Sequence, residues 1–166
     1  ARPEKLDPHE PENVAEAVER MQLAHAVITS VDRDDLPDYG AGHWVETIEA
    51  IKRRSPETKI EILTPDYMGD WDQLKRVLDT HVDVFSHNTE TVPRLYRRLR
   101  SKGVYETCLE LLNQLDKYRV EHQIRMTTKT GVICGLGEEI PEILERRINP
   151  RSEIERSELV SEIKSI

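Results

Sequence analysis

The sequence has few aromatic residues, little cysteine and no long apolar run. One Phe and two Trp occur among 166 residues, so a core has to be built mainly from Ile, Val and Leu. No apolar run approaches the roughly 20 residues that a membrane span needs. A globular domain is therefore expected, because 37% hydrophobic and 34% charged residues suit one and the length allows a real core.

Metal-ligand patterns and basic charge are lacking as well. Cys108 and Cys134 fit no short metal-ligand spacing, so no metal site is predicted, and we expect two reduced core thiols rather than a disulfide. The net charge of −8 argues against the phosphate backbone of a nucleic acid as partner. Walker, Gly-x-Gly-x-x-Gly and His-x-x-x-His motifs are missing, and no nucleophile triad is legible. The most readily recognised nucleotide, metal and hydrolase sites are thus not predicted.

What the sequence does contain is a regular alternation of strand and helix patterns. The rhythm predicts parallel strands joined by crossover helices, in an α/β barrel or an open sheet. About four to five βα units are present, which is only part of an eight-unit barrel. We expect residues 1–147 to form this partial (βα) barrel and residues 148–166 to form a charged, helical tail. Helices are expected over 12–23, 43–54, 71–80, 92–100, 104–118 and 140–147, and strands over 24–30, 59–64, 82–86 and a fourth region, 125–135.

Polar side chains gather just after three of the expected strands. In parallel α/β folds the carboxyl ends of the strands meet at one rim, where ligands bind. The three groups are therefore predicted to face one site for a polar, zwitterionic or ribose-bearing ligand. The candidates are the hydroxyls of Thr29, Ser30, Thr89, Thr128 and Thr130, the acids Asp32, Asp34, Asp35, Glu90 and Glu138, and His87, Asn88, Lys129, Gly135 and Gly137.

Each of these groups has a purely structural alternative. Asp and Ser after strands often cap the next helix, so residues 32–38 taken alone favour a capping or surface loop. The run Gly-Leu-Gly-Glu at 135–138 is explained equally by a turn followed by an acid at a helix N-terminus. His87 beside Asn88 fits a buried pair. The convergence of three strand ends on one rim is what favours a site.

Several long segments occur in an order and spacing typical of one enzyme family. They are VITSVDRDDLPD with GAGH (27–38 and 40–43), IEILTPD (60–66), HNTETVPRLYRRLR (87–100), YETCLELL (105–112) and TKTGVICGLGE (128–138). On these segments the chain resembles lipoyl synthase from residue 1 to about 139. The lead-in ARPEKLDPHEPENVAEAV also resembles the family segment that follows its cluster-binding cysteines.

This resemblance implies a partial barrel of the radical S-adenosylmethionine (SAM) type and a sulfurtransferase that makes the lipoyl cofactor. The reaction is sulfur insertion into a protein-bound octanoyl chain, with SAM and two [4Fe–4S] clusters as cofactors and an octanoylated lipoyl-carrier protein as partner. The implied compartment is the cytoplasm, or the mitochondrion or plastid in a eukaryote. By resemblance, Thr29, Ser30 and Asp32 face the methionine end of SAM, Asn88 and Glu90 its ribose, and Lys129, Thr130, Gly135 and Gly137 complete the wall.

Cysteine is where the chain departs from the family. The radical cluster needs a CxxxCxxC triad, because three thiolates hold three of its irons, and these 166 residues contain none. We therefore expect no sulfur insertion by this segment alone, and a partner chain or further sequence to complete the barrel. Tyr39, where the family usually has Gly, and Cys134 are smaller departures. They favour an alternative, a cluster-free relative acting as a binding or scaffold subunit. A third reading is a generic βα-barrel enzyme acting on a small polar substrate.

Overall fold

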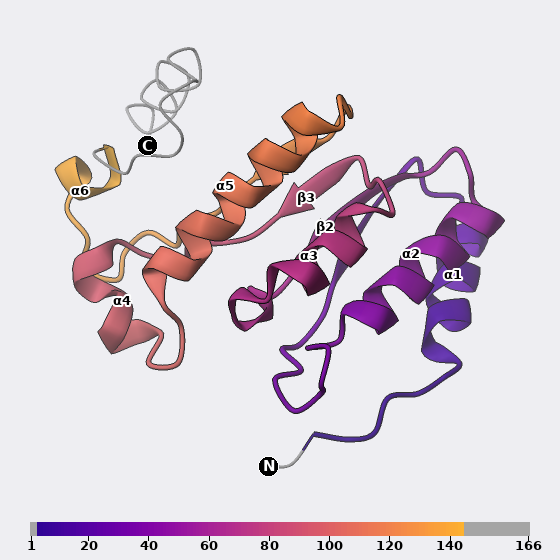
Figure 1. The fold of residues 1–166 in the computed structure, drawn as a ribbon, viewed down its shortest axis with the longest axis horizontal. Helices are drawn as coiled ribbons and strands as arrows, with labels where there is room; N and C mark the ends of the chain where they lie inside the picture. Colours follow the sequence, from indigo (N-terminus) through magenta and orange to yellow (C-terminus); the bar gives the residue numbers. More distant parts are fainter. Residues whose placement is uncertain (1–2, 145–166) are drawn as a thin grey trace.

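The computed structural model describes residues 3–144, which form a four-stranded parallel sheet covered by helices (Figure 1). All strand pairs are parallel, as predicted, the strands lie in chain order, and the described sheet does not close into a barrel. The strands are β1 (His25–Thr29), β2 (Lys59–Leu63), β3 (Val84–Ser86) and β4 (Thr127–Lys129). The helices are α1 (Glu10–Met21), α2 (Ala41–Arg54), α3 (Trp71–Leu78), α4 (Pro93–Leu99), α5 (Tyr105–Glu121) and α6 (Ile140–Leu144), with a 3-10 turn, η1 (Tyr67–Gly69).

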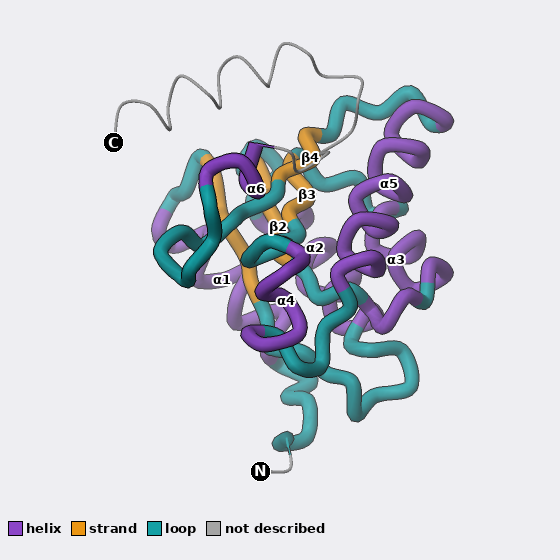
Figure 2. Tube along the Cα trace, turned by 90° about the vertical axis from the view of Figure 1, so that its left-hand side faces the viewer, coloured by secondary structure: helices purple, strands orange, loops and turns teal. Residues whose placement is uncertain are grey.

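The two faces of the sheet have different surroundings. Alternate strand residues such as Ala26, Ile60, Ile62 and Phe85 are at most 3% exposed and belong to the core. Figure 2 shows α3 and α5 together on one side of the strands. On the other face Val27 is 56% exposed. We call this second face the open face; its side chains are those of His25, Val27, Thr29, Lys59, Glu61, Leu63, Val84, Ser86, Thr127 and Lys129.

Local sequence signals set the helix boundaries. Pro11 lies in the first turn of α1, where its missing N–H would have had no helical partner. Asp70 caps α3, since its carboxylate accepts hydrogen bonds from two backbone N–H groups of the first turn at 3.1 and 3.3 Å. The apolar stripes of α2 and α3 then pack on the sheet through Ile48, Ile51 and Leu74, each at most 1% exposed. None of the helices within residues 3–144 combines the length and hydropathy needed to cross a bilayer.

Some expectations about the fold are corrected. The fourth strand region, 125–135, is shortened to β4 and an isolated bridge between Val132 and Glu90, because the partner strand β3 ends at Ser86. Cys134 lies on the loop beyond β4 and is exposed, so its placement in the core was wrong; Cys108 is buried, and both thiols are free. The predicted tail, 148–166, and the end of the last helix lie outside the described residues.

Candidate functional site

A buried carboxylate lies in the middle of the open face. Glu61, the central residue of β2, is 7% exposed and has a partner on each of the other strands. Its Oε2 lies 3.2 Å from His25 Nε2 on β1. Its Oε1 accepts hydrogen bonds from Ser86 Oγ on β3 at 3.2 Å and from Lys129 Nζ on β4 at 2.8 Å. We call His25, Glu61, Ser86 and Lys129 the open-face cluster, which joins all four strands through one carboxylate.

The electrostatics of the open-face cluster follow from these contacts. The Lys129 ammonium, with Ser86 and His25, holds the pKa of Glu61 below its usual value of 4.5, although burial acts in the opposite direction. Glu61 is therefore anionic at neutral pH. The Lys129 side chain is 60% exposed, whereas that of Glu61 is 9% exposed. The cluster is an ion pair whose negative end is buried and whose positive end is open to solvent.

The loops that follow β3 and β4 pack against each other beside this ion pair. A Cβ atom on Gly131 would lie 2.6 Å from Asn88 Oδ1, so the Asn88 amide can lie here only because position 131 is glycine. The N–H of Glu90 donates to Gly131 O at 3.2 Å, and the N–H of Ile133 donates to Glu90 O at 2.8 Å. These bonds hold the Glu90 backbone at φ 61°, a conformation that residues other than glycine rarely adopt. The sequence neighbours Lys129 and Thr130 enter the same pair of loops, so four predicted site residues are brought together here.

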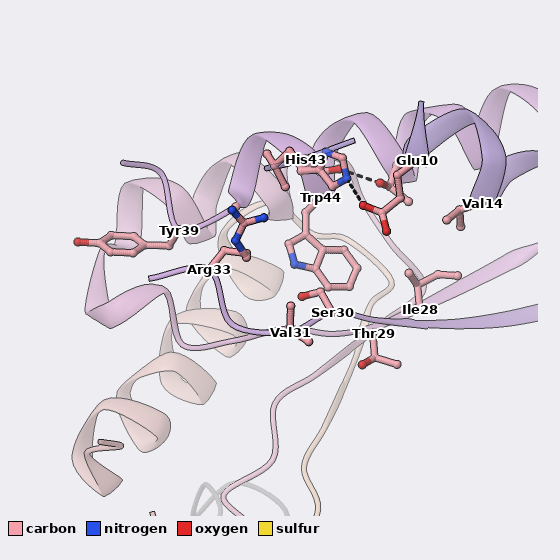
Figure 3. Close-up of a pocket in the computed structure, with 13 residues that line it drawn as sticks. Glu10, Val14, Ile28, Thr29, Ser30, Val31, Arg33, Tyr39, His43 and Trp44 are labelled. Atoms are coloured by element: carbon pink, nitrogen blue, oxygen red, sulfur yellow. Dashed lines mark hydrogen bonds and ion pairs between the residues drawn. The ribbon is translucent and has the colours of Figure 1, made fainter. Parts of the chain in front are cut away.

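The first predicted strand end, Thr29 and Ser30, borders a cavity of about 340 Å³ between β1, α1 and α2 (Figure 3). His43 Nε2 and Glu10 Oε2 are paired at 2.7 Å on its wall. Figure 3 shows Ser30 below the Trp44 indole, whereas the Thr29 side chain points away from it. The Thr29 side chain therefore belongs to the open face, although the residue also borders the cavity, whereas Ser30 belongs to the cavity alone. The cavity is lined by Leu6, Glu10, Val14, Ile28, Thr29, Ser30, Val31, Arg33, Tyr39, Gly40, His43, Trp44 and Thr47.

Some of the acids in the loop after β1 have structural partners within the protein. Arg33 donates two hydrogen bonds to the Asp35 carboxylate, at 2.8 and 2.9 Å. Asp38 accepts hydrogen bonds from two backbone N–H groups at the start of α2, at 3.1 and 2.9 Å, and is a capping residue. Asp32 is exposed. Asp34 is exposed as well, so Asp32 and Asp34 both stay predicted ligand contacts.

The glycine turn after β4 is organised by its own acid. Gly135 and Gly137 have φ of 99° and 108°, which explains glycine at both positions. The Glu138 carboxylate accepts hydrogen bonds from the N–H groups of Gly135 and, at 2.9 Å, Leu136. Arg94 of α4 donates to Gly137 O at 2.9 Å. Backbone conformation thus accounts for the glycines, and contact between this turn and a ligand remains a prediction.

His87, one residue after Ser86, belongs to a second cluster on the helix side of the sheet. Its Nδ1 lies 2.9 Å from Thr64 O and its Nε2 lies 3.1 Å from Cys108 Sγ, which is also 2.9 Å from the Tyr96 hydroxyl. Because a carbonyl oxygen only accepts, Nδ1 carries the proton and Nε2 accepts from the Cys108 thiol. We call His87, Tyr96 and Cys108 the helix-side cluster; it replaces the expected pair of His87 with Asn88.

Burial sets the charge of the helix-side cluster. It lowers the pKa of His87 and raises the pKa values of Cys108 and Tyr96, so all three groups are neutral at neutral pH. His87 and Tyr96 are each 3% exposed and Cys108 is fully buried. The cluster joins α4 and α5 to the end of β3 and, within residues 3–144, is closed to solvent.

Sequence reasoning missed Glu61. Its partners come from strands 36, 25 and 68 residues away along the chain, so no local pattern could identify them. A weak signal was present, because Glu61 is an acid between two isoleucines in a strand otherwise expected to be buried. An acid at such a position needs partners. Ser86 and Lys129 are the last residues of β3 and β4, whereas His25 is the first residue of β1.

Metal ligands do not gather in the described residues. Among residues 3–144, no three His, Cys, Asp or Glu side chains lie together so that they could hold a metal ion. Cys108 is engaged with His87 and Tyr96, and Cys134 lies exposed on a loop. The described residues therefore do not fit a [4Fe–4S] cluster.

Comparison with known proteins identifies close sequence relatives. The family model for the radical SAM superfamily matches residues 1–146. The chain is 47% identical over 144 residues to the lipoyl synthase of Parabacteroides distasonis. The match covers 87% of this chain and 49% of that protein, so the chain spans about half the length of the curated relative. The resemblance found in the motifs is confirmed.

Proposed function

The chain belongs to the radical SAM superfamily, and from this premise we propose that it is the core of a lipoyl synthase. The proposed reaction is sulfur insertion into an octanoyl chain carried by a lipoyl-carrier protein. The observation that carries the proposal is 47% identity over 144 residues to a lipoyl synthase. The polar rim at the carboxyl ends of the strands supports it, because that is where ligands bind in parallel α/β folds.

The residues of the rim suit the polar parts of SAM. The exposed Lys129 ammonium can bind a carboxylate, and the side chains of Asn88 and Glu90 can accept hydrogen bonds from ribose hydroxyls. Thr130 lies beside Lys129, and Thr29 is on the same face of the sheet. We assign these residues to SAM binding, and extend the assignment to Ser30, Asp32, Gly135 and Gly137 by resemblance.

The open face also offers apolar surface beside the open-face cluster. Val27, Glu61 and Val84 are register partners on neighbouring strands, and Leu63 follows Glu61 on the same face. Val27 is 56% exposed, and Leu63 and Val84 are half-buried. An aliphatic chain laid across these residues would bury apolar surface close to the polar rim. This combination supports an acyl substrate held next to SAM.

The iron–sulfur clusters of this family supply the electron and the sulfur when they are bound. This chain cannot supply the cysteine ligands of the radical cluster, because it has two cysteines and that cluster needs three thiolates. We therefore assign to the described residues only the binding and orientation of SAM and of the acyl chain. The cluster ligands are proposed to come from the parts of the protein that these residues do not include.

The test is to produce the protein from its complete gene under anaerobic conditions and to supply SAM, a reductant and an octanoylated carrier domain. Mass spectrometry of the carrier should show an octanoyl chain converted to a lipoyl chain, together with 5′-deoxyadenosine. Formation of 5′-deoxyadenosine without sulfur on the carrier would point to a different radical SAM reaction. Absence of iron and of both products would favour the cluster-free scaffold.

The 166-residue chain by itself is the matched control. We expect it to insert no sulfur, since its two cysteines cannot supply the three thiolates of the radical cluster. Sulfur insertion by this chain alone would contradict the assignment of its residues to binding and orientation.

A further inference from the structure

The fold does not explain a carboxylate at position 61. Glu61 lies on β2 between Val27 and Val84, its register partners, and is 7% exposed. Burying a charge is costly, and replacing a buried ion pair by apolar residues of similar volume is often neutral or stabilising. The packing of the sheet therefore does not by itself require an acid here. The reason for an acid at position 61 therefore has to be sought in the side chains that it binds.

Glu61 holds a cation at the place where the site residues converge. Lys129 is the last residue of β4, in register with Ser86, and the next residues enter the loop that packs against Asn88. A lysine ammonium has three donors, and Glu61 Oε1 accepts one of them at 2.8 Å. The exposed side chain of Lys129 can direct the others to a ligand.

The remaining contacts of Glu61 fix its own position. Ser86 Oγ donates to Oε1, and His25 Nε2 lies beside Oε2, so both carboxylate oxygens are held by neighbouring strands. A flexible lysine loses less rotamer freedom on binding a ligand when a rigid partner already restricts it. The Lys129 ammonium also keeps the pKa of Glu61 below 4.5, so the pair stays charged at neutral pH.

We propose that Glu61 is a positioning residue that fixes the Lys129 ammonium so that it binds the carboxylate of an adenosyl amino-acid ligand. This inference rests on the proposed function, because the ligand is the amino-acid end of SAM. Glu61 itself does not touch the ligand in this arrangement. It acts through Lys129.

The test compares two ligands that differ in the amino-acid end. S-adenosylhomocysteine carries the carboxylate, and 5′-methylthioadenosine lacks it. Their dissociation constants are measured by calorimetry for the protein produced from its complete gene and for Glu61→Gln, Lys129→Met and the double variant. Glu110→Gln, which removes an acid paired with Lys117 on α5, is the matched control.

We expect Glu61→Gln to weaken binding of S-adenosylhomocysteine about tenfold, the effect of one charge-assisted hydrogen bond, and to leave methylthioadenosine binding unchanged. Lys129→Met should do the same, and the double variant should be no weaker than Lys129→Met, because the two residues act as one unit. Glu110→Gln should bind both ligands like the unaltered protein. Glu61→Leu, measured with its thermal unfolding, provides a second folded variant that should show the same selectivity.

Equal weakening of both ligands by Glu61→Gln and by Glu61→Leu would overturn the inference, since it indicates a structural role. Normal binding of both ligands by these variants, with weak S-adenosylhomocysteine binding by Lys129→Met, would also overturn it and leave the proposed function intact. Failure of the unaltered protein to bind either ligand would overturn the proposed function, and this inference with it.

Discussion

Two polar clusters lie on opposite faces of the sheet at the end of β3, and consecutive residues belong to them. Ser86 points to the open-face cluster, and His87 points to the helix-side cluster. The first is charged, and its lysine side chain is 60% exposed. The second is neutral, with His87 only 3% exposed.

The difference between the clusters separates function from stability. A closed neutral cluster has to satisfy its own hydrogen bonds, and His87 does so through Thr64 O and Cys108. A charged cluster that is open to solvent at one end contributes little to the stability of a sheet, but it places a cation where a ligand can reach it. Variants of the helix-side cluster should therefore change the free energy of unfolding, whereas variants of the open-face cluster should change ligand binding.

The largest expected loss of stability is in the helix-side cluster. His87→Ala removes the partner of Thr64 O, leaves Cys108 with the Tyr96 hydroxyl alone and opens a cavity under α5, so the free energy of unfolding should fall by about 3 kcal/mol. Urea denaturation measures this loss. His9→Ala, at an exposed position, is the control and should change the free energy by less than about 0.5 kcal/mol. Similar values for the two variants would contradict a structural role for the cluster.

The two clusters should also lose stability in different pH ranges, with His87 first. Burial lowers its pKa in the folded protein below the usual 6.5, so below pH 6.5 the unfolded chain binds a proton that the folded chain does not. Stability should fall as the pH drops below 6.5, by up to about 1.4 kcal/mol per pH unit. His87→Gln should lack this component when urea unfolding is repeated across the range. A parallel pH dependence of both proteins would show that another group titrates.

The comparison also shows how far sequence reasoning reaches. Alternating strands and helices, and polar residues after strands, were predictable because periodicity and turn residues are local signals. The link between Glu61 and Lys129 depends on the register of β2, β3 and β4, which the sequence does not display. Asp38 illustrates a different limit: its type suits both a ligand and a cap, and the geometry of α2 decides for the cap. Cys134 was misplaced because the end of β4 was predicted too late.

A substitution in the open-face cluster should have a smaller effect on stability. Glu61→Leu removes a buried charge and lets the exposed Lys129 ammonium be solvated, but it takes the carboxylate acceptor from the buried Ser86 hydroxyl, so the free energy of unfolding at neutral pH should fall by only about 1 kcal/mol. The original protein gains stability from the ionised Glu61 above pH 4.5 and loses it as the pH falls through the lower pKa of the folded state. The variant should lack this acid-range decline. A loss of several kcal/mol at neutral pH would mean that the open-face cluster is structural after all.

The smallest effects are expected outside both clusters, at the exposed thiol. Cys134→Ser should change the free energy of unfolding by less than about 0.5 kcal/mol, because an exposed loop side chain loses no packing. Cys108→Ser, inside the helix-side cluster, replaces the thiol by a shorter hydroxyl next to His87 and Tyr96 and should cost more, about 1 kcal/mol.

Alkylation of the native protein, followed by peptide mass spectrometry, gives an independent measure of the difference between the two cysteines. Cys134 should be modified at once, whereas Cys108, whose pKa is raised by burial, should react only when urea opens the α5 side of the sheet. Rapid modification of Cys108 in the native protein would mean that the helix-side cluster opens readily, and the contrast between a closed and an open cluster would then fail.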